Sequence, residues 1–165
     1  MKKFFLLLLL ICFCSAGYSQ KYISGSMMVQ NEFESEQLKF SIAPEFGYHL
    51  SDRRAIGITL NYILEKDKKN VIAFQPYYRY YFIVGKVGFF LDGIIGVTAT
   101  VPKQGDTAWG LKCGFTPGIN FKLSDKFSFI SKLGFLGYYQ PDETKKYIRL
   151  NVDASNLQFG VLYKF

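Results

Sequence analysis

The sequence predicts an all-β fold, an eight-stranded antiparallel up-and-down transmembrane β-barrel. Apolar side chains alternate with polar or small ones in eight segments, most of them 9 to 15 residues long. In the second to seventh segments and in residues 157–165 the apolar positions hold no charged residue, whereas the interleaved positions hold nine. Tight turns and longer loops alternate between the segments, which is the layout of a barrel that crosses a membrane.

The first 19 residues are predicted to be a signal peptide, and residues 20–165 the barrel domain. Lys2 and Lys3 precede an apolar run over residues 4–13, and Gly17 and Ser19 supply the small residues of a cleavage site. The run is too short for a stable span, although a retained N-terminal helix is the alternative. Cleavage leaves Cys113 as the sole cysteine, so no intrachain disulfide is expected in the mature chain.

The eight strands follow in order along the chain. The first, over residues 21–31, has the weakest alternation, with Ile23, Met27 and Val29 on its apolar face. The others are predicted over residues 38–50, 55–65, 72–84, 87–99, 109–123, 127–139 and 147–165. Tight turns are predicted at residues 51–54, 85–86 and 124–126, and loops at 66–70, 101–108 and 140–146.

Two features interrupt this regular pattern. Pro44, Pro76 and Pro117 occupy apolar positions of the second, fourth and sixth strands, and each predicts a bulge or local break because proline gives no N–H to the ladder. The apolar phase flips before Leu157, which predicts a bulge near residues 154–156 or, alternatively, a turn there. In the seventh strand all odd-numbered residues, Phe135 included, are expected on the apolar face.

Strand length decides which face meets lipid. A soluble sandwich also alternates, but its apolar face lies inside and its strands usually run about 5 to 6 residues. A tilted membrane strand needs about 9 to 11 residues, and small or polar side chains suit the crowded interior of an eight-stranded barrel. We therefore expect the apolar face to point outward into lipid and the charged face to point into the barrel.

Four of the interior charges are expected at one depth. Glu45, Arg79, Asp92 and Lys132 each lie six residues from the nearest tight turn, and their formal charges sum to zero. An unpaired charge in a packed interior is costly, so these side chains are predicted to pair in a network that plugs the barrel.

The last residues of the chain carry a known pattern. Gln158, Gly160, Tyr163 and Phe165 fit polar-x-Gly-x-x-aromatic-x-aromatic at the C-terminus, which resembles the signal that the barrel-assembly machinery recognises. Together with the Pro-x-x-Gly-Tyr segment that begins at Pro44 and the Leu-Ser-Asp turns, the chain resembles the small outer-membrane β-barrel family common in Bacteroidota, which is similar to OmpA/OmpX-type eight-stranded barrels. This resemblance implies an outer-membrane location more than an activity.

Few residues suggest catalysis or metal binding. His49 is the only histidine, so a histidine-based metal site is not expected. Some eight-stranded barrels modify lipid A with His, Ser and a carboxylate; His49, Ser51 and Asp52 supply these types but lie at a predicted periplasmic turn, away from the outer leaflet. No cofactor and no catalytic residue is predicted.

The predicted function is that of a non-enzymatic integral outer-membrane barrel with a structural, surface-display or envelope-complex role, and not a wide pore. A lipid-modifying enzyme or a membrane subunit of a secretion complex is the alternative. Expected partners are outer-membrane lipids, lipopolysaccharide and, during biogenesis, the barrel-assembly machinery. The mature chain has 18 basic and 13 acidic residues, but they are dispersed and the chain is exported, so nucleic acid is not expected as a partner. The oligomeric state and any specific ligand are left open.

Overall fold

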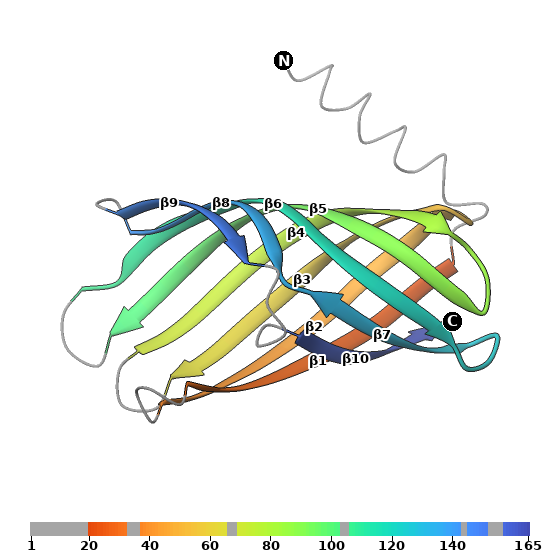
Figure 1. The fold of residues 1–165 in the computed structure, drawn as a ribbon, viewed down its shortest axis with the longest axis horizontal. Coiled ribbons are helices and arrows are strands. Elements are labelled where there is room, and N and C mark those ends of the chain that lie inside the picture. Colours follow the sequence, from red (N-terminus) through yellow and green to blue (C-terminus); the bar gives the residue numbers. More distant parts are fainter. Residues whose placement is uncertain (1–19, 33–36, 66–68, 103–105, 143–144, 152–156) are drawn as a thin grey trace, which may run out of the picture.

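The computed structural model describes residues 20–32, 37–65, 69–102, 106–142, 145–151 and 157–165, which form an all-β, closed antiparallel barrel (Figure 1). The predicted signal peptide, residues 1–19, and the predicted bulge at 154–156 lie outside the described residues, so both stay predictions. No helix in the described part of the chain is long and apolar enough to cross a membrane.

Ten strand segments build the wall, and most are longer than a typical soluble strand. They are β1 (Gln20–Glu32), β2 (Gln37–Ser51), β3 (Arg54–Glu65), β4 (Lys69–Ile83), β5 (Val87–Pro102), β6 (Ala108–Lys122), β7 (Phe127–Leu133), β8 (Phe135–Asp142), β9 (Lys145–Asn151) and β10 (Leu157–Lys164).

These segments form eight passes, each of which runs along the barrel wall from one end to the other. Consecutive strands pair antiparallel from β1 to β6, and β10 closes the ring by pairing with β7 on one side and β1 on the other. One half of β6 pairs with β7 and the other half with β8, so β7 and β8 are two parts of the seventh pass. Likewise β9 pairs with β8 while β10 pairs with β7, which makes them parts of the eighth. The predicted eight-stranded barrel is confirmed.

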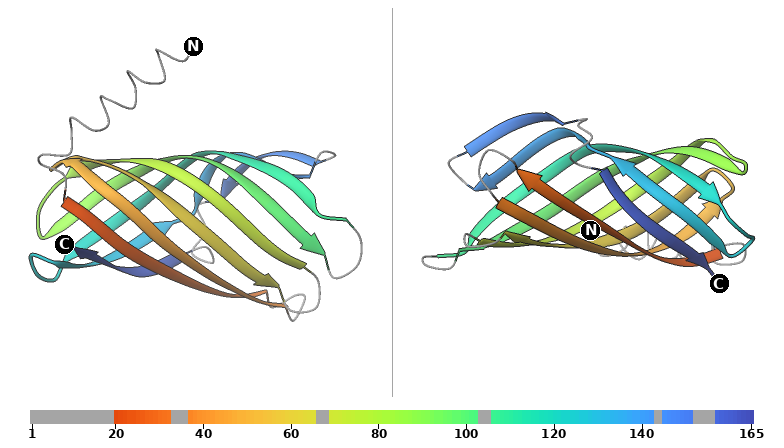
Figure 2. Two further views of the ribbon diagram at one scale, coloured as in Figure 1. Left: turned by 180° about the vertical axis from the view of Figure 1, so that it is seen from behind. Right: turned by 60° about the horizontal axis from the view of Figure 1, so that its bottom comes forward.

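The two ends of the barrel differ, as Figures 1 and 2 show. The turns between β2 and β3, β4 and β5, and β6 and β7 lie at one end, together with the C-terminus and the start of β1. Ser124 Oγ accepts a hydrogen bond from the Phe127 backbone N–H at 3.0 Å, and Lys122 pairs with Asp125 at 2.8 Å. That lysine lowers the pKa of the Asp125 carboxyl. The predicted tight turns are therefore present, and we call this end the turn end and the other the loop end.

Strands extend further toward the loop end than the alternation predicted. Lys69 pairs with Pro102 and Asn70 with Val101, although all four were expected in loops. Backbone pairing continues past the last alternating side chain because each buried or paired N–H and C=O group gains a partner. The loops are correspondingly shorter.

The two faces of the wall follow the predicted parity over most of the ring. Residues of the interleaved series, such as Ser41, Ala73 and Thr98, are buried inside the barrel. Apolar residues such as Phe74 and Trp109 are exposed on the outside, at 45% and 66% of their surface. The interior is thus lined by small and polar side chains, as a narrow barrel requires.

Each of the three prolines lies at a local gap in the ladder. Pairing between β2 and β3 skips Pro44, and pairing between β4 and β5 skips Pro76, without a change of register in either case. Pro117 lies between the part of β6 that pairs with β7 and the part that pairs with β8. Local breaks were one of the two outcomes that the missing N–H groups predicted.

The seventh pass contains a bulge that the alternation did not predict. Phe115 pairs with Leu136 and Gly118 with Lys132, so three steps along β6 correspond to four on the other side. Gly134 sits in this gap with φ of 65°, a left-handed conformation that glycine adopts without steric cost. The extra residue reverses the parity: Phe135 is buried inside and Leu136 is exposed. The expectation that Phe135 faces lipid was wrong.

Candidate functional site in the barrel interior

The four charged residues singled out by parity and spacing meet inside the barrel. Glu45 comes from β2, Arg79 from β4, Asp92 from β5 and Lys132 from β7, and each is at most 5% exposed. Arg79 and Asp92 are direct cross-strand partners, so their side chains start from neighbouring positions on the same face. We call these four residues the charged layer.

Every member of the charged layer contacts an opposite charge. Arg79 Nε lies 2.6 Å from Asp92 Oδ1, and its Nη2 lies 2.9 Å from both Asp92 Oδ2 and Glu45 Oε1. Lys132 Nζ lies 2.5 Å from Glu45 Oε2 and 3.5 Å from Asp92 Oδ2. Two cations and two carboxylates therefore alternate in a closed ring with no net formal charge. Charge-assisted and bidentate contacts of this kind are among the stronger hydrogen bonds in proteins.

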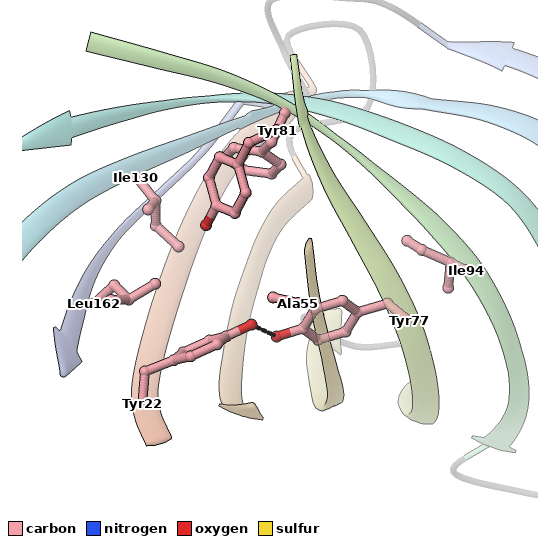
Figure 3. Close-up of a cluster of buried hydrophobic side chains, with 8 residues drawn as sticks. Tyr22, Ala55, Tyr77, Tyr81, Ile94, Ile130 and Leu162 are labelled. Atoms are coloured by element: carbon pink, nitrogen blue, oxygen red, sulfur yellow. Dashed lines mark hydrogen bonds between the residues drawn. The ribbon is translucent and has the colours of Figure 1, made fainter. Parts of the chain in front are cut away.

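Aromatic residues complete the layer, and they were not singled out from the sequence. Tyr77 donates to Glu45 Oε1 at 2.8 Å, and its hydroxyl lies 2.5 Å from that of Tyr22 across the lumen (Figure 3). The Arg79 guanidinium lies over the Phe90 ring at 4.1 Å from its centroid, in cation–π contact. The signal was present in the sequence: Tyr77 and Phe90 stand two residues from Arg79 and Asp92, on the same inward parity.

Glycines on the neighbouring strands make room for these rings. A Cβ atom built at Gly47 would lie 2.3 Å from the Tyr22 ring, and one built at Gly118 would lie 2.2 Å from the Phe90 ring. An alanine at either position would clash with the ring, since real Cβ atoms do not approach other atoms so closely. Each of these large interior side chains therefore lies over a glycine that is its pairing partner on the adjacent strand, which explains part of the glycine content of the polar series.

The charged layer separates two spaces. Toward the loop end lies a cavity of about 170 Å³ whose floor includes Asp92 and Lys132. Toward the turn end lies a vestibule of about 1400 Å³ lined by residues such as His49, Asn120 and Lys164. The two spaces share no lining residue. Between them lie the rings of Tyr22 and Phe90 and the apolar side chains of Ile130 and Leu162, all almost fully buried.

His49, Ser51 and Asp52, the residue types of a lipid-modifying site, all line the vestibule at the turn end. The His49 ring packs between Tyr22 and Tyr81, with centroid distances of 4.9 and 5.9 Å. Ser51 Oγ accepts a hydrogen bond from the Arg53 backbone N–H, inside the turn. In the described residues no hydrogen bond links His49 to Ser51 or Asp52, and no group of three or more His, Cys, Asp or Glu could hold a metal ion. Cys113 is exposed on the outer face, as its parity predicted.

The residues of the predicted assembly signal lie on β10 and just after it. Phe165 is 70% exposed on the outside, and its ring meets that of Tyr163 edge to face at 5.2 Å. Gln158 Oε1 accepts a hydrogen bond from Ser26 at 3.4 Å. A Cβ atom at Gly160 would lie 2.3 Å from the carbonyl oxygen of Gly25, so close packing of β1 against β10 requires glycine at this position.

The fold and interior together define a class: a closed, eight-stranded antiparallel barrel with an apolar outer surface and a polar, side-chain-filled interior. The crystal structure of Neisserial surface protein A (NspA) has this fold. It aligns with a TM-score of 0.58 and 14% identity over 89% of this chain and 97% of that chain. A de novo designed transmembrane β-barrel aligns more distantly, with a TM-score of 0.42 and 9% identity over 88% of this chain.

Neither a family model nor a curated protein matches the chain. The resemblance to the Bacteroidota barrel family therefore stays a prediction that rests on the motifs.

Proposed function

We propose that the chain is an integral outer-membrane β-barrel with a structural, surface-display or envelope-complex role, and that its lumen is closed. The observation that supports the membrane location is the outer surface. Ile58, Phe74, Ile95, Trp109 and Phe159, from five different strands, each expose between 41% and 66% of their surface. A soluble monomer rarely exposes an apolar patch larger than a few hundred Å², whereas a lipid-facing barrel needs an apolar band on every strand.

The charged layer supports the closed lumen. Its side chains reach across the barrel from β2, β4, β5 and β7 and contact one another directly, with Phe90 and Tyr77 packed against the guanidinium. A solute that passed from the vestibule to the cavity would have to break these ion pairs inside a packed interior, which is energetically costly. The proposed role is therefore not that of a diffusion pore.

Fractionation combined with gel migration tests the proposal. The full chain, expressed with its own N-terminus in a Gram-negative host, should appear in the outer-membrane fraction and migrate differently before and after boiling, because folded barrels resist unfolding in the gel. In planar bilayers the folded protein should show no stable conductance. Recovery in the soluble periplasmic fraction would contradict the membrane location, and steady channel currents would contradict the closed lumen.

The proposed role is non-enzymatic, with the His49 ring packed against Tyr22 and Tyr81. Outer-membrane lipids and lipopolysaccharide are the partners that the outer surface would meet, and the barrel-assembly machinery is the proposed partner during insertion.

A further inference from the structure

The cavity above the charged layer has the features of a built binding site. Its volume of about 170 Å³ is close to that of an engineered protein cavity, about 150 Å³, that binds a single benzene ring. It extends from Asp92 and Lys132 toward the loop end, where Asn61 and Val71 line it near the ends of β3 and β4. The space therefore suits one six-membered ring.

The lining is polar, unlike that of the benzene cavity. Hydroxyl and amide groups of Thr59, Asn61, Gln75, Thr98 and Thr116 face it from β3, β4, β5 and β6. The Thr98 side chain is 3% exposed, and within the described residues its Oγ1 has no hydrogen-bond partner. A buried hydroxyl without a partner is costly, and most such groups in proteins are satisfied. Thr98 therefore identifies a point at which a ligand group or a water would gain a hydrogen bond.

Aromatic rings form the rest of the wall. Tyr77 lines the cavity from β4, and Phe135 lines it because the bulge at Gly134 turns this residue inward. The Phe135 ring also carries the Lys112 ammonium at 4.4 Å from its centroid. Without the extra residue Phe135 would face lipid, so the bulge contributes directly to the shape of the cavity.

We propose that this cavity binds a single sugar residue. Such a ring is small enough for the space, carries hydroxyls around its edge for the Thr, Asn and Gln groups, and has C–H faces that pack on aromatic rings. Charges of both signs line the cavity, from Asp92, Lys112 and Lys132, and these groups can accept from or donate to sugar hydroxyls. The ligand is either a free sugar from outside the cell or a sugar residue of the lipopolysaccharide glycan. Entry from outside rests on the proposed function, whereas sugar binding itself does not.

Ligand-observed NMR on the folded mature barrel tests the proposal. The protein is held in dodecylphosphocholine micelles, because detergents with sugar headgroups would compete for the site. Glucose, galactose and N-acetylglucosamine are each added, with benzene as the apolar comparison. Saturation transfer to at least one sugar, saturable by that sugar, is expected. Benzene binding without any sugar binding, or no binding of any of the four, would overturn the proposal.

Two variants locate the binding. Thr98→Val keeps the side-chain shape but removes the hydroxyl, and should weaken sugar binding about five- to tenfold, the effect of one lost hydrogen bond. Thr116→Val provides the same test from β6 if the first variant fails to fold. The matched control is Ser24→Ala, which removes another buried hydroxyl without a partner, outside the cavity lining. Equal sugar affinity in all three folded variants would contradict the assignment of the sugar site to this cavity.

A displacement experiment in lipid vesicles distinguishes the two possible sources of the sugar. Displacement of the free sugar by lipopolysaccharide with its full glycan, but not by lipid A alone, identifies the glycan as the source. Displacement by neither identifies a free sugar, and both results support the sugar site. The micelle assay does not depend on membrane location, so its failure is distinguishable from failure of the proposed function.

Discussion

Arg79 is the residue on which the charged layer depends. Its guanidinium contacts both carboxylates, and Lys132 alone would have to serve them if it were removed. A buried ion-pair network adds little net stability over an apolar core of the same shape, but breaking it by removing one partner is costly because the other charges stay buried.

Replacing Arg79 with methionine should lower the free energy of unfolding by about 3 to 5 kcal/mol, because Glu45 and Asp92 are left with one cation between them. Urea unfolding of the barrel in lipid vesicles measures this. The control is Lys122→Met, which removes an exposed lysine that pairs with Asp125 at the turn end and should cause no measurable loss.

Removal of all four charges together, with residues of similar volume, should restore much of the stability that Arg79→Met loses, because no buried charge is then left without a partner. Equal stability of Arg79→Met and Lys122→Met would contradict the account of the charged layer.

Gly118 faces the Phe90 ring and leaves no space for a methyl group. Gly118→Ala should destabilise the barrel by about 1 to 3 kcal/mol through overpacking, and Phe90→Leu in the same chain should recover part of that loss. Gly25→Ala is the matched control, since no atom of the described part of the chain lies within 4 Å of a Cβ atom built there. A destabilisation equal to that of Gly25→Ala would show that the ring moves aside freely.

At the scale of the strands, parity predicted most of what the structure shows. Charged residues such as Glu45 and Arg79 could be placed inside because period-two alternation assigns every residue of a regular strand to a face. The bulge could not be found this way. Gly134 has no side chain to mark its face, and Leu133, Phe135 and Leu136 are all apolar, so either phase fits the pattern.

The aromatic residues of the interior were not predicted as part of the charged layer, for a related reason. Parity put Tyr77 and Tyr81 inside, but tyrosine is common on both faces of a membrane barrel. Only the contacts of Tyr77 with Glu45 and Tyr22 reveal its place in the charged layer.

Gly134→Ala should cost about 1 to 2 kcal/mol, because alanine at a φ of 65° is strained by its Cβ atom. Deleting Gly134 should cost more, since β8 would then present Phe135 to lipid and Leu136 to the cavity. Unfolding midpoints of the two variants test this order. A deletion that is as stable as the parent chain would mean that the bulge has no role in the packing of the seventh pass.

Phe165 contacts Tyr163 on the outside and contributes nothing to the charged layer. Deleting it should reduce the amount of folded barrel in the outer membrane, because the terminal aromatic of the predicted assembly signal is lost. Refolding of the purified variant into lipid vesicles is the control and should be nearly normal. Parent-like levels in the outer membrane would count against the assembly signal.

For the whole molecule, the fold and the charged layer describe a cylinder that is apolar outside and blocked in the middle. The 170 Å³ cavity lies toward the loop end and the vestibule toward the turn end. In a membrane, the two sides of such a barrel meet different compartments. We expect the turn end to face the periplasm, because short turns occupy that side in outer-membrane barrels.

Thiol labelling of intact cells tests this central claim most directly. Cys113, on the outer face, is first replaced by serine, and single cysteines are placed at Asp125 in a tight turn and at Asp142 near a loop. A membrane-impermeant maleimide should label position 142 in intact cells and position 125 only after the outer membrane is opened. Labelling at 125 but not at 142 would reverse the orientation, and labelling at neither position before opening would contradict a chain that spans the outer membrane.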